Sequence, residues 1–307
     1  MTFQRITRRI LPDGKSQTVY PFHVCTEGKE NRVVCRDSED LRVAYNFIPI
    51  CARRSNVLPV AICVLNSHMH SFILASSFKD ACRFGDSYKR SYSKYFGRRY
   101  GHNTNIYLDT DSTPILLEDD KHVRNAICYI FRNSIDAGFA VNKYIWSSFG
   151  SLFCDGQANT PGTDISAYSD MKRRSLFKTA DHLSDSKWLV DSNGVLVPES
   201  FCDWKYAESA FFNNKKFFLK VMGLTDDEQM KQILEYDHLH PKSIEEVISS
   251  ANAKSLSRYG VSFDVLSLEQ KIPIIKTLYH SLRTTPAQLA RSLGLEKGKI
   301  LWILGKS

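Results

Sequence analysis

The sequence predicts an α+β fold, an antiparallel sheet with helices packed on it, followed by an all-helical C-terminal domain. Three observations support this prediction. From Thr18 to Ile135 short apolar strand patterns alternate with helical patterns, whereas the chain from Phe201 onward carries helical patterns only. Between them, residues 156–200 are rich in Gly, Pro, Ser, Thr and Asp, which is typical of a linker or an irregular insertion.

Composition narrows the class of protein. The chain has 307 residues, enough for two domains, and its 43% hydrophobic and 24% charged residues are those of a soluble globular protein. Lys and Arg number 41 against 33 acidic residues, a net charge of +8. This excess favours a polyanionic partner, nucleic acid more than membrane.

Localisation is predicted to be cytoplasmic. No apolar run approaches the length that spans a bilayer, and the N-terminus lacks the apolar core of a signal peptide, so we expect no membrane association. The eight cysteines are scattered, without CxxC pairs. They are typical of buried thiols in a reducing compartment. The first ten residues carry three arginines and are interpreted as a basic arm.

The elements of the first part follow in the order strand, helix, strand, strand, helix, strand, helix. Acidic or hydroxyl residues suited to N-caps precede each helix, and Asn66-Ser67 forms the turn between the two consecutive strands. This order predicts a ferredoxin-like arrangement. We place the elements at Thr18–Cys25, Asp37–Ala52, Val60–Leu65, Met69–Ala75, Ser77–Phe96, Thr113–Leu117 and Glu118–Ile135.

Two histidines stand at the start of the fourth element. His68 and His70 alternate along a strand, so their imidazoles share a face. Two imidazoles side by side on a rigid strand make half of a divalent-metal site. A second pair, His238 and His240, has the same spacing but follows a helical pattern and precedes a proline, so it is interpreted as a solvated helix end.

The predicted helix that ends near Ile135 has an apolar stripe, and Tyr129 lies outside this stripe. Because Tyr129 lies on the opposite side, its phenol is directed to a polar site or to solvent. Asn133, one turn later, is expected beside it and could ligate the same metal or orient the phosphate. The polar side holds His122, Asn125, Tyr129, Asn133 and Asp136.

Together these groups define one chemistry. A metal held by two histidines and one amide or carboxylate keeps open positions for phosphate oxygens and acts as a Lewis acid. A tyrosine hydroxyl beside it attacks phosphorus and forms a phosphotyrosine intermediate, which conserves the phosphodiester energy for rejoining.

The same residues carry a family resemblance over about Tyr20–Phe153. An apolar strand followed by HMHSFIL, then GRRYGHN, DDKHVRNAICYIFRNSIDAGFA and YIWSSF, resembles the HUH single-strand DNA transposases of insertion sequences and of repetitive extragenic palindromes. The resemblance implies that His68 and His70 bind the metal and that Tyr129 is the nucleophile. Asn133 stands where some relatives have a metal-binding glutamine, with Asp136 or His122 as alternatives. The family's proline before the first histidine is absent, and Ser134 replaces another proline.

The resemblance implies an enzyme that cleaves and rejoins single-stranded or hairpin DNA as a homodimer, with Mg²⁺ or Mn²⁺ as its cofactor. The alternative is a catalytically silent DNA-binding regulator derived from such a transposase. A replication-initiation or relaxase nuclease of the same superfamily is disfavoured, because the single tyrosine lies on a helix well after the histidines.

The helix Ser77–Phe96 has an aromatic face and a basic face. Four aromatic residues at helical spacing are interpreted as core rather than as a base-stacking platform. The basic residues on the other face, with those just beyond the helix, are a candidate track for a DNA backbone or an ordinary solvated surface. These DNA-binding candidates are Arg83, Arg90, Lys94, Arg98 and Arg99.

The last forty or so residues have helix-turn-helix spacing. A helix over Leu268–Leu282 is followed by Thr285-Pro286 as the start of a second helix, which ends at Gly294 before a third over Glu296–Leu304. A plain three-helix packing unit remains the alternative. If the last helix enters a DNA groove, Lys297 and Lys299 contact phosphates. The predicted organisation is a catalytic domain at 1–155, the linker or insertion at 156–200, and a helical domain at 201–307 with the helix-turn-helix at 268–304.

Overall fold

A computed structural model describes residues 3–27, 33–101, 106–107, 113–153, 161–224, 244–281 and 286–305. The chain divides into two compact units, Met1–Ile233 and Leu234–Ser307. Each unit is described by itself. The first is mixed α and β, and the described part of the second is helical, so the predicted combination of an antiparallel sheet with packed helices and an all-helical C-terminal part is confirmed.

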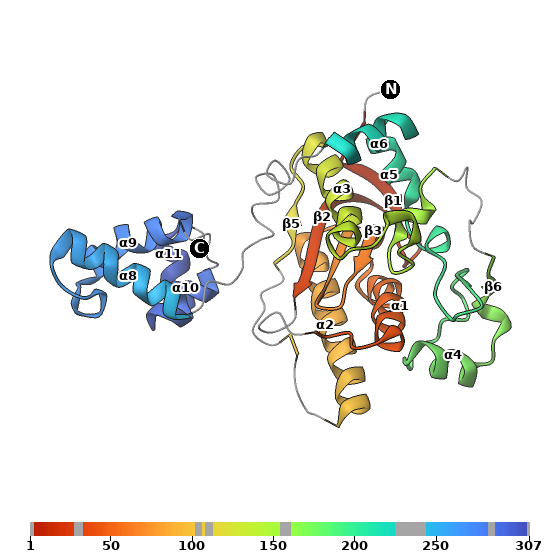
Figure 1. Ribbon diagram of the computed structural model, residues 1–307, viewed down its shortest axis with the longest axis horizontal. Helices are drawn as coiled ribbons and strands as arrows, with labels where there is room; N and C mark the ends of the chain where they lie inside the picture. Colours follow the sequence, from red (N-terminus) through yellow and green to blue (C-terminus); the bar gives the residue numbers. More distant parts are fainter. Residues whose placement is uncertain are drawn as a thin grey trace. The chain divides into compact units, whose positions relative to one another are not determined.

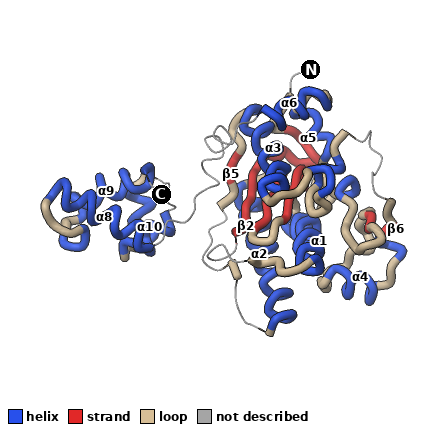
Figure 2. Tube along the Cα trace, viewed as in Figure 1, coloured by secondary structure: helices blue, strands red, loops and turns tan. Residues whose placement is uncertain are grey.

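The first unit is built on a five-stranded sheet in which every paired strand is antiparallel to its neighbour. The long second strand pairs with the first, fourth and fifth strands, and the third lies beyond the fourth (Figures 1 and 2). All four predicted strands are present, although the one expected at Thr113–Leu117 covers only Ile115–Leu116. The strands are β1 (Thr7–Ile10), β2 (Ser16–Glu27), β3 (Leu58–Val64), β4 (His68–Ala75) and β5 (Ile115–Leu116).

Three long helices start at the side-chain caps expected from the sequence. Asp37, Ser77 and Asp119 each accept a hydrogen bond from the backbone N–H three residues later, which satisfies a donor left open at a helix start. The second helix continues four residues past the expected end, to a left-handed Gly101 with φ of 69°. These helices are α1 (Ser38–Ser55), α2 (Phe78–Tyr100) and α3 (Asp120–Asp136).

Strand β4 separates two layers of helix. Met69 and Ile73 point to the main hydrophobic core, which they share with α1 and α2. Alternate residues point to the other face, where Phe72 contacts Tyr206 with ring centroids 5.8 Å apart. The four aromatic residues of α2 that were predicted to be core, Phe84, Tyr88, Tyr92 and Tyr95, do belong to it.

The segment interpreted as a linker or insertion is an ordered insertion over its described residues, 161–200. Its elements are β6 (Thr163–Asp164), α4 (Asp170–Phe177), β7 (Leu189–Val190) and short 3-10 helices at Ile165–Ala167 and Pro198–Ser200. Phe177 and Leu196 join the main core. The buried Asn46 of α1 donates to Gly194 O at 2.8 Å and accepts from Leu196 N at 2.9 Å, so the insertion is fastened to α1.

The helices that follow the insertion also belong to the first unit. In α5 (Trp204–Ala210) the side chain of Tyr206 packs beneath β4, and α6 (Lys215–Leu224) buries Phe218 against Phe131 of α3. The predicted domain boundary at residue 201 therefore differs from the observed one near residue 233. The reason is that these short helices bury their apolar faces on the sheet and on α3.

The predicted basic arm forms a strand instead. Residues Thr7–Ile10 are β1 and pair with Ser16–Val19 of β2. Arg9 forms a salt bridge with Asp203 through Nε and Oδ2 at 2.6 Å. This charge is neutralised within the protein.

Over the described residues of the second unit, four α-helices pack around one apolar cluster that includes Leu278, Leu289 and Ile300. Gly294 follows the third helix with φ of 62°, the left-handed cap that the sequence predicted. The predicted cap Thr285 and the His238–His240 pair lie outside the described residues. The helices are α8 (Ile244–Tyr259), α9 (Leu268–Ser281), α10 (Pro286–Leu293) and α11 (Lys297–Ile303), with a 3-10 helix at Phe263–Val265.

Candidate active site

The two histidines of β4 lie on the face of the sheet away from α1 and α2. Their ring centroids are 4.7 Å apart, with the planes nearly perpendicular at 88°. His68 starts the strand, is half-buried, and has Nδ1 2.8 Å from Ser67 Oγ. His70 is 2% exposed. The alternation expected for this strand therefore does bring the two imidazoles together.

Tyr129 comes to the same place from α3. Its ring centroid is 5.0 Å from that of His70, at an interplanar angle of 75°. The side chain is 7% exposed. Helix α3 approaches closely because the β3 residues paired with Phe72 and His70 are Ala61 and Cys63, which are small.

A third histidine completes this cluster and was not singled out from the sequence. His23 of β2 stacks on His70, with planes 14° apart and His70 Nδ1 3.3 Å from His23 Nε2. It is 1% exposed, and its centroid is 6.2 Å from that of Tyr129. The alternation of Thr18–Cys25 was visible in the sequence, but the pairing of β2 with β4 that brings His23 here was not.

The amide of Asn133 is committed to its own helix. Its Nδ2 donates to the backbone oxygen of Tyr129 at 2.8 Å, so as a metal ligand it would have only its Oδ1. Among the alternatives, His122 is half-buried at the start of α3, and the side chain of Asp136 lies outside the described residues. Asn125, one turn before Tyr129, is 5% exposed, and its Nδ2 has no hydrogen-bond partner within the described structure.

The cluster supplies only part of a metal-binding site. Within the described ranges, no group of three His, Cys, Asp or Glu side chains lies close enough to hold an ion. His68 and His70 supply two nitrogen ligands, and the residue paired with His68 in the strand register is Glu27. Cys63 is paired with His70 in the strand register, and burial raises the pKa of its thiol well above the usual range.

No protein-family model, curated protein or solved structure matches the chain. In the part of the chain that the structure describes, none of the helices combines the length and apolar character needed to cross a membrane. An assignment of function therefore depends on the geometry of the site and on the motifs that form it.

The predicted DNA-binding residues of α2 fall into two groups. Arg83 and Arg99 are held by carboxylates: Arg83 lies 3.3 Å from Asp80, and Arg99 pairs with Asp37 and Asp40. Arg90, Lys94 and Arg98 are exposed along one side of the helix and line a groove. In the second unit, Lys297 and Lys299 are exposed in the first turn of α11.

Proposed function

We propose that the protein is a metal-dependent tyrosine transposase or nickase that cleaves and rejoins single-stranded or hairpin DNA. One observation carries the proposal: the phenol ring of Tyr129 and the imidazoles of His68 and His70 meet on one face of the sheet. A buried tyrosine beside two histidines on a rigid strand is the pairing of nucleophile and metal ligands that this chemistry requires.

In the proposed reaction the oxygen of the Tyr129 side chain attacks a phosphodiester phosphorus. A bond forms between Tyr129 Oη and phosphorus, and the bond from phosphorus to the 3′ oxygen breaks. The phenol loses its proton and the departing 3′ oxygen gains one. The product is a 5′-phosphotyrosine and a free 3′ hydroxyl, and reversal of the step by another 3′ hydroxyl rejoins the strand without ATP.

His68 and His70 are the residues that would hold Mg²⁺ or Mn²⁺, with Asn133, Asp136 or His122 as the proposed further ligand. When bound, the ion supplies Lewis-acid stabilisation of the charge on the phosphate oxygens. Asn125, one turn before Tyr129 on α3, is a candidate for a further phosphate contact, because its buried amide is a donor that has no partner among the described residues.

The architecture supports the proposal. Elements β2, α1, β3, β4, α2 and β5 follow in the order β-α-β-β-α-β of the ferredoxin-like arrangement. The histidines lie on the central strand β4, and the tyrosine lies on α3, the helix that follows β5. The YIWSSF segment lies against β3, where Tyr144 OH donates to Val64 O at 2.7 Å. Tyr129 meets the histidines of its own chain, so the proposed homodimer does not have to exchange this helix.

The test is formation of a covalent adduct. The protein is incubated with a labelled hairpin oligonucleotide carrying a single-stranded flank, with Mn²⁺ or Mg²⁺, and resolved on a denaturing gel. We expect an adduct that is lost in Tyr129→Phe and in His68→Ala. Tyr206→Phe is the matched control, since it removes one hydroxyl from a buried tyrosine on the same face of the sheet, where it bonds Arg5 O.

The control variant should form the adduct at the wild-type level. An adduct that persists in Tyr129→Phe would refute the role of Tyr129. A tight DNA complex without an adduct, with either metal, would instead favour the catalytically silent regulator.

A further inference from the structure

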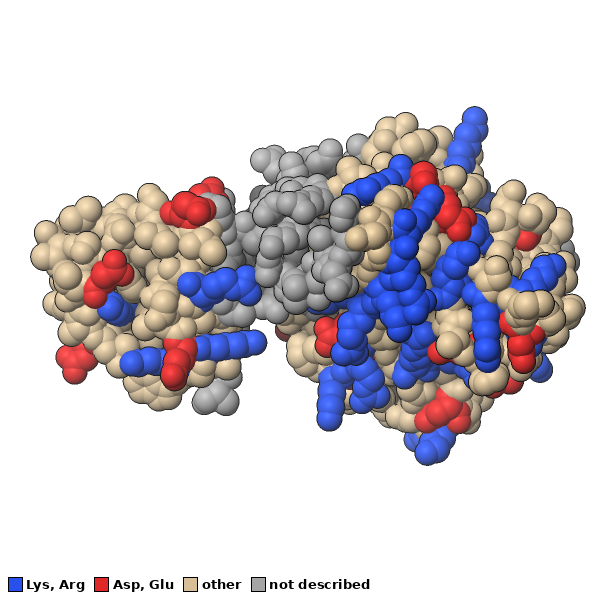
Figure 3. Space-filling view, turned by 90° about the horizontal axis from the view of Figure 1, so that it is seen from below, with Lys and Arg blue, Asp and Glu red and all other residues tan. Residues whose placement is uncertain are grey.

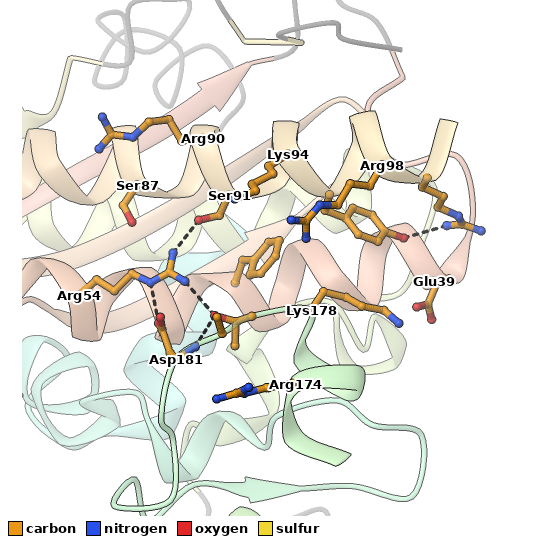
Figure 4. Close-up of a pocket in the computed structure, with 15 residues that line it drawn as sticks. Glu39, Arg54, Ser87, Arg90, Ser91, Lys94, Arg98, Arg174, Lys178 and Asp181 are labelled. Carbon is orange, nitrogen blue, oxygen red and sulfur yellow. Dashed lines mark hydrogen bonds and ion pairs between the residues drawn. The ribbon is translucent and has the colours of Figure 1, made fainter. Parts of the chain in front are cut away.

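A basic groove lies on the side of α1 and α2 that faces the insertion, on the other side of the sheet from Tyr129. Its volume is about 840 Å³. Figure 3 shows basic side chains crowded on this side of the first unit, and Figure 4 shows the groove with α2 along one wall and α4 with the residues after it along the other. The cations that line it are Arg54, Arg90, Lys94, Arg98, Arg99, Arg174 and Lys178.

Most of this charge is not neutralised by the protein. The two acids of the lining, Glu39 and Asp181, are paired with Arg42 and Arg54 respectively. Over the described residues, Arg90, Lys94 and Arg98 of α2 form no salt bridge with a carboxylate, and neither do Arg174 and Lys178 on the opposite wall. Asp170 attracts Arg174 through space, but its salt bridge is to Arg173. Five cations therefore face one cavity from two walls. Their positive charges repel one another, and a bound anion would relieve this repulsion.

The groove is preformed, because the insertion is fixed to the helices. Arg54 donates to Ser91 Oγ of α2 at 2.7 Å and to Thr179 Oγ1 at 2.8 Å, and its Nε contacts Asp181 at 2.6 Å. The neighbouring Arg53 donates to His182 O at 2.7 Å. Two consecutive arginines thus set the distance between the walls before any ligand binds.

The spacing of the cations fits a repeating polyanion. Arg90, Lys94 and Arg98 are four residues apart, which on a helix places them about 6 Å apart in a row. Phosphates of one strand follow a helical path, so neighbouring phosphates lie farther apart in space than their rise of ~3.4 Å along the axis, and the row of cations can follow one phosphate backbone.

The lining argues for a base-paired nucleic acid over an unpaired strand. Proteins that bind unpaired strands stack the bases on exposed aromatic side chains. The two aromatic residues of this lining, Phe47 and Tyr95, are 2% and 8% exposed, and the hydroxyl of Tyr95 donates to Asp40. The groove therefore offers contacts to phosphates and no stacking surface.

We infer that this groove is a second nucleic-acid site, which holds the phosphate backbone of a base-paired segment while Tyr129 acts on an unpaired one. The inference rests on the proposed function for the pairing of the two sites, but binding in the groove does not depend on catalysis. The insertion supplies one wall, so Arg174 and Lys178 are phosphate-binding residues.

The experiment measures binding of a fluorescent DNA duplex by anisotropy over a range of salt concentrations, with full-length Tyr129→Phe protein so that no cleavage intervenes. The groove variants are R174E/K178E on one wall and R90A/K94A on the other. The matched control is K15E/K216E, which reverses two exposed lysines outside the groove. Circular dichroism and thermal melting check that each variant is folded.

We expect each groove variant to weaken duplex binding at least about 10-fold and to reduce the salt slope by about 2, with the control within about 2-fold of the parent. Groove variants that are folded and bind duplex as the control does would overturn the inference. Binding of inorganic tripolyphosphate that is lost in the groove variants while duplex binding is kept would also overturn it, in favour of a small polyphosphate.

Failure of the proposed function is seen separately. Absence of the covalent adduct, together with groove variants that lose duplex binding, would reject catalysis and keep the groove. Formation of the adduct by the wild type, together with unchanged duplex binding in the groove variants, would keep catalysis and reject the groove.

Discussion

His70 and His23 lie ring on ring, with Nδ1 of His70 3.3 Å from Nε2 of His23 and both side chains almost fully buried. A hydrogen bond between these atoms needs a proton on one nitrogen and a lone pair on the other. Because His23 engages Nδ1, a metal held by His70 is held through Nε2. Outer partners of this kind orient the ligand ring and fix its tautomer.

Replacing His23 is therefore predicted to act on the metal dependence of the reaction. In His23→Ala, the Mn²⁺ concentration that gives half-maximal adduct formation should rise about 10–100-fold, because His70 loses its orienting partner. Binding of single-stranded DNA should not change. His23→Gln, which keeps a hydrogen-bonding group, should recover part of the effect, and the exposed His182→Gln is the control. An unchanged Mn²⁺ dependence in His23→Ala would rule out this role.

Asn133→Ala separates two roles of that residue. Its amide donates to the backbone oxygen of Tyr129, so its removal should lower the free energy of unfolding by about 1 kcal/mol. Because this bond holds the amide against its own helix, we favour Asp136 or His122 over Asn133 as the further ligand. The Mn²⁺ dependence of adduct formation in Asn133→Ala should then stay that of the wild type, whereas His70→Ala should abolish the adduct. If Asn133→Ala shifts the Mn²⁺ dependence as strongly as a histidine variant does, Asn133 is a ligand through Oδ1 and this prediction is wrong.

The start of α1 should show an acid-dependent stability. Hydrogen bonding from Arg99 holds the pKa of Asp37 below its usual range. Its contribution is therefore present above about pH 4, the ordinary value for Asp, and is lost as the pH falls through the lower pKa of the folded state. Asp37→Asn keeps a capping oxygen but not the charge.

Urea unfolding of both proteins from pH 7 to pH 2 measures this effect. The wild type should be more stable at pH 7 by less than about 1 kcal/mol, because Asp37 is 46% exposed, and the difference should vanish at the acid end. A difference that is constant with pH would contradict the charge-based explanation.

The cysteines should differ in reactivity. Burial raises the pKa of the Cys35 and Cys128 thiols to about 12, so they remain protonated and shielded at pH 8. Cys25 and Cys82 are half-buried. Alkylation of the native protein at pH 8, mapped by mass spectrometry, should modify these two first among the seven cysteines that the structure describes. Equal labelling of all seven in the native state would contradict the packing.

The unit boundary can be tested by truncation. A fragment of residues 1–233 should unfold cooperatively, whereas a fragment of residues 1–200 lacks Tyr206, Phe211 and Phe218, which are buried against the sheet and α3. Each such side chain contributes roughly 1.5–3 kcal/mol, so the loss is about 5 kcal/mol or more. Thermal denaturation of the two fragments measures the difference, and equal melting temperatures would contradict it.

What the sequence predicted well was local. Asp37, Ser77 and Asp119 mark helix starts because a cap bonds a backbone group three residues away, and β4 shows its faces because alternate residues share one side. These local signals, with the order of the motifs, were enough to predict that His68, His70 and Tyr129 lie close together.

What could not be predicted depended on pairing between distant segments. His23 reaches the site only because β2 pairs with β4 in one register. The packing of Tyr206 under β4, and of α4 beside α1, likewise depends on contacts between residues more than a hundred positions apart. The composition of residues 156–200 indicates an irregular insertion, but it does not predict that this insertion forms one wall of the basic groove.

Strand β4 keeps the histidines and the groove on opposite sides of a single sheet. A DNA molecule that touches both must pass around an edge of that sheet, since no chain can cross it. The thickness of the protein layer then acts as a ruler: it fixes a minimum number of unpaired nucleotides between the base-paired stem and the bond that is cut. Shortening that spacer in the oligonucleotide should leave stem binding intact and stop cleavage abruptly.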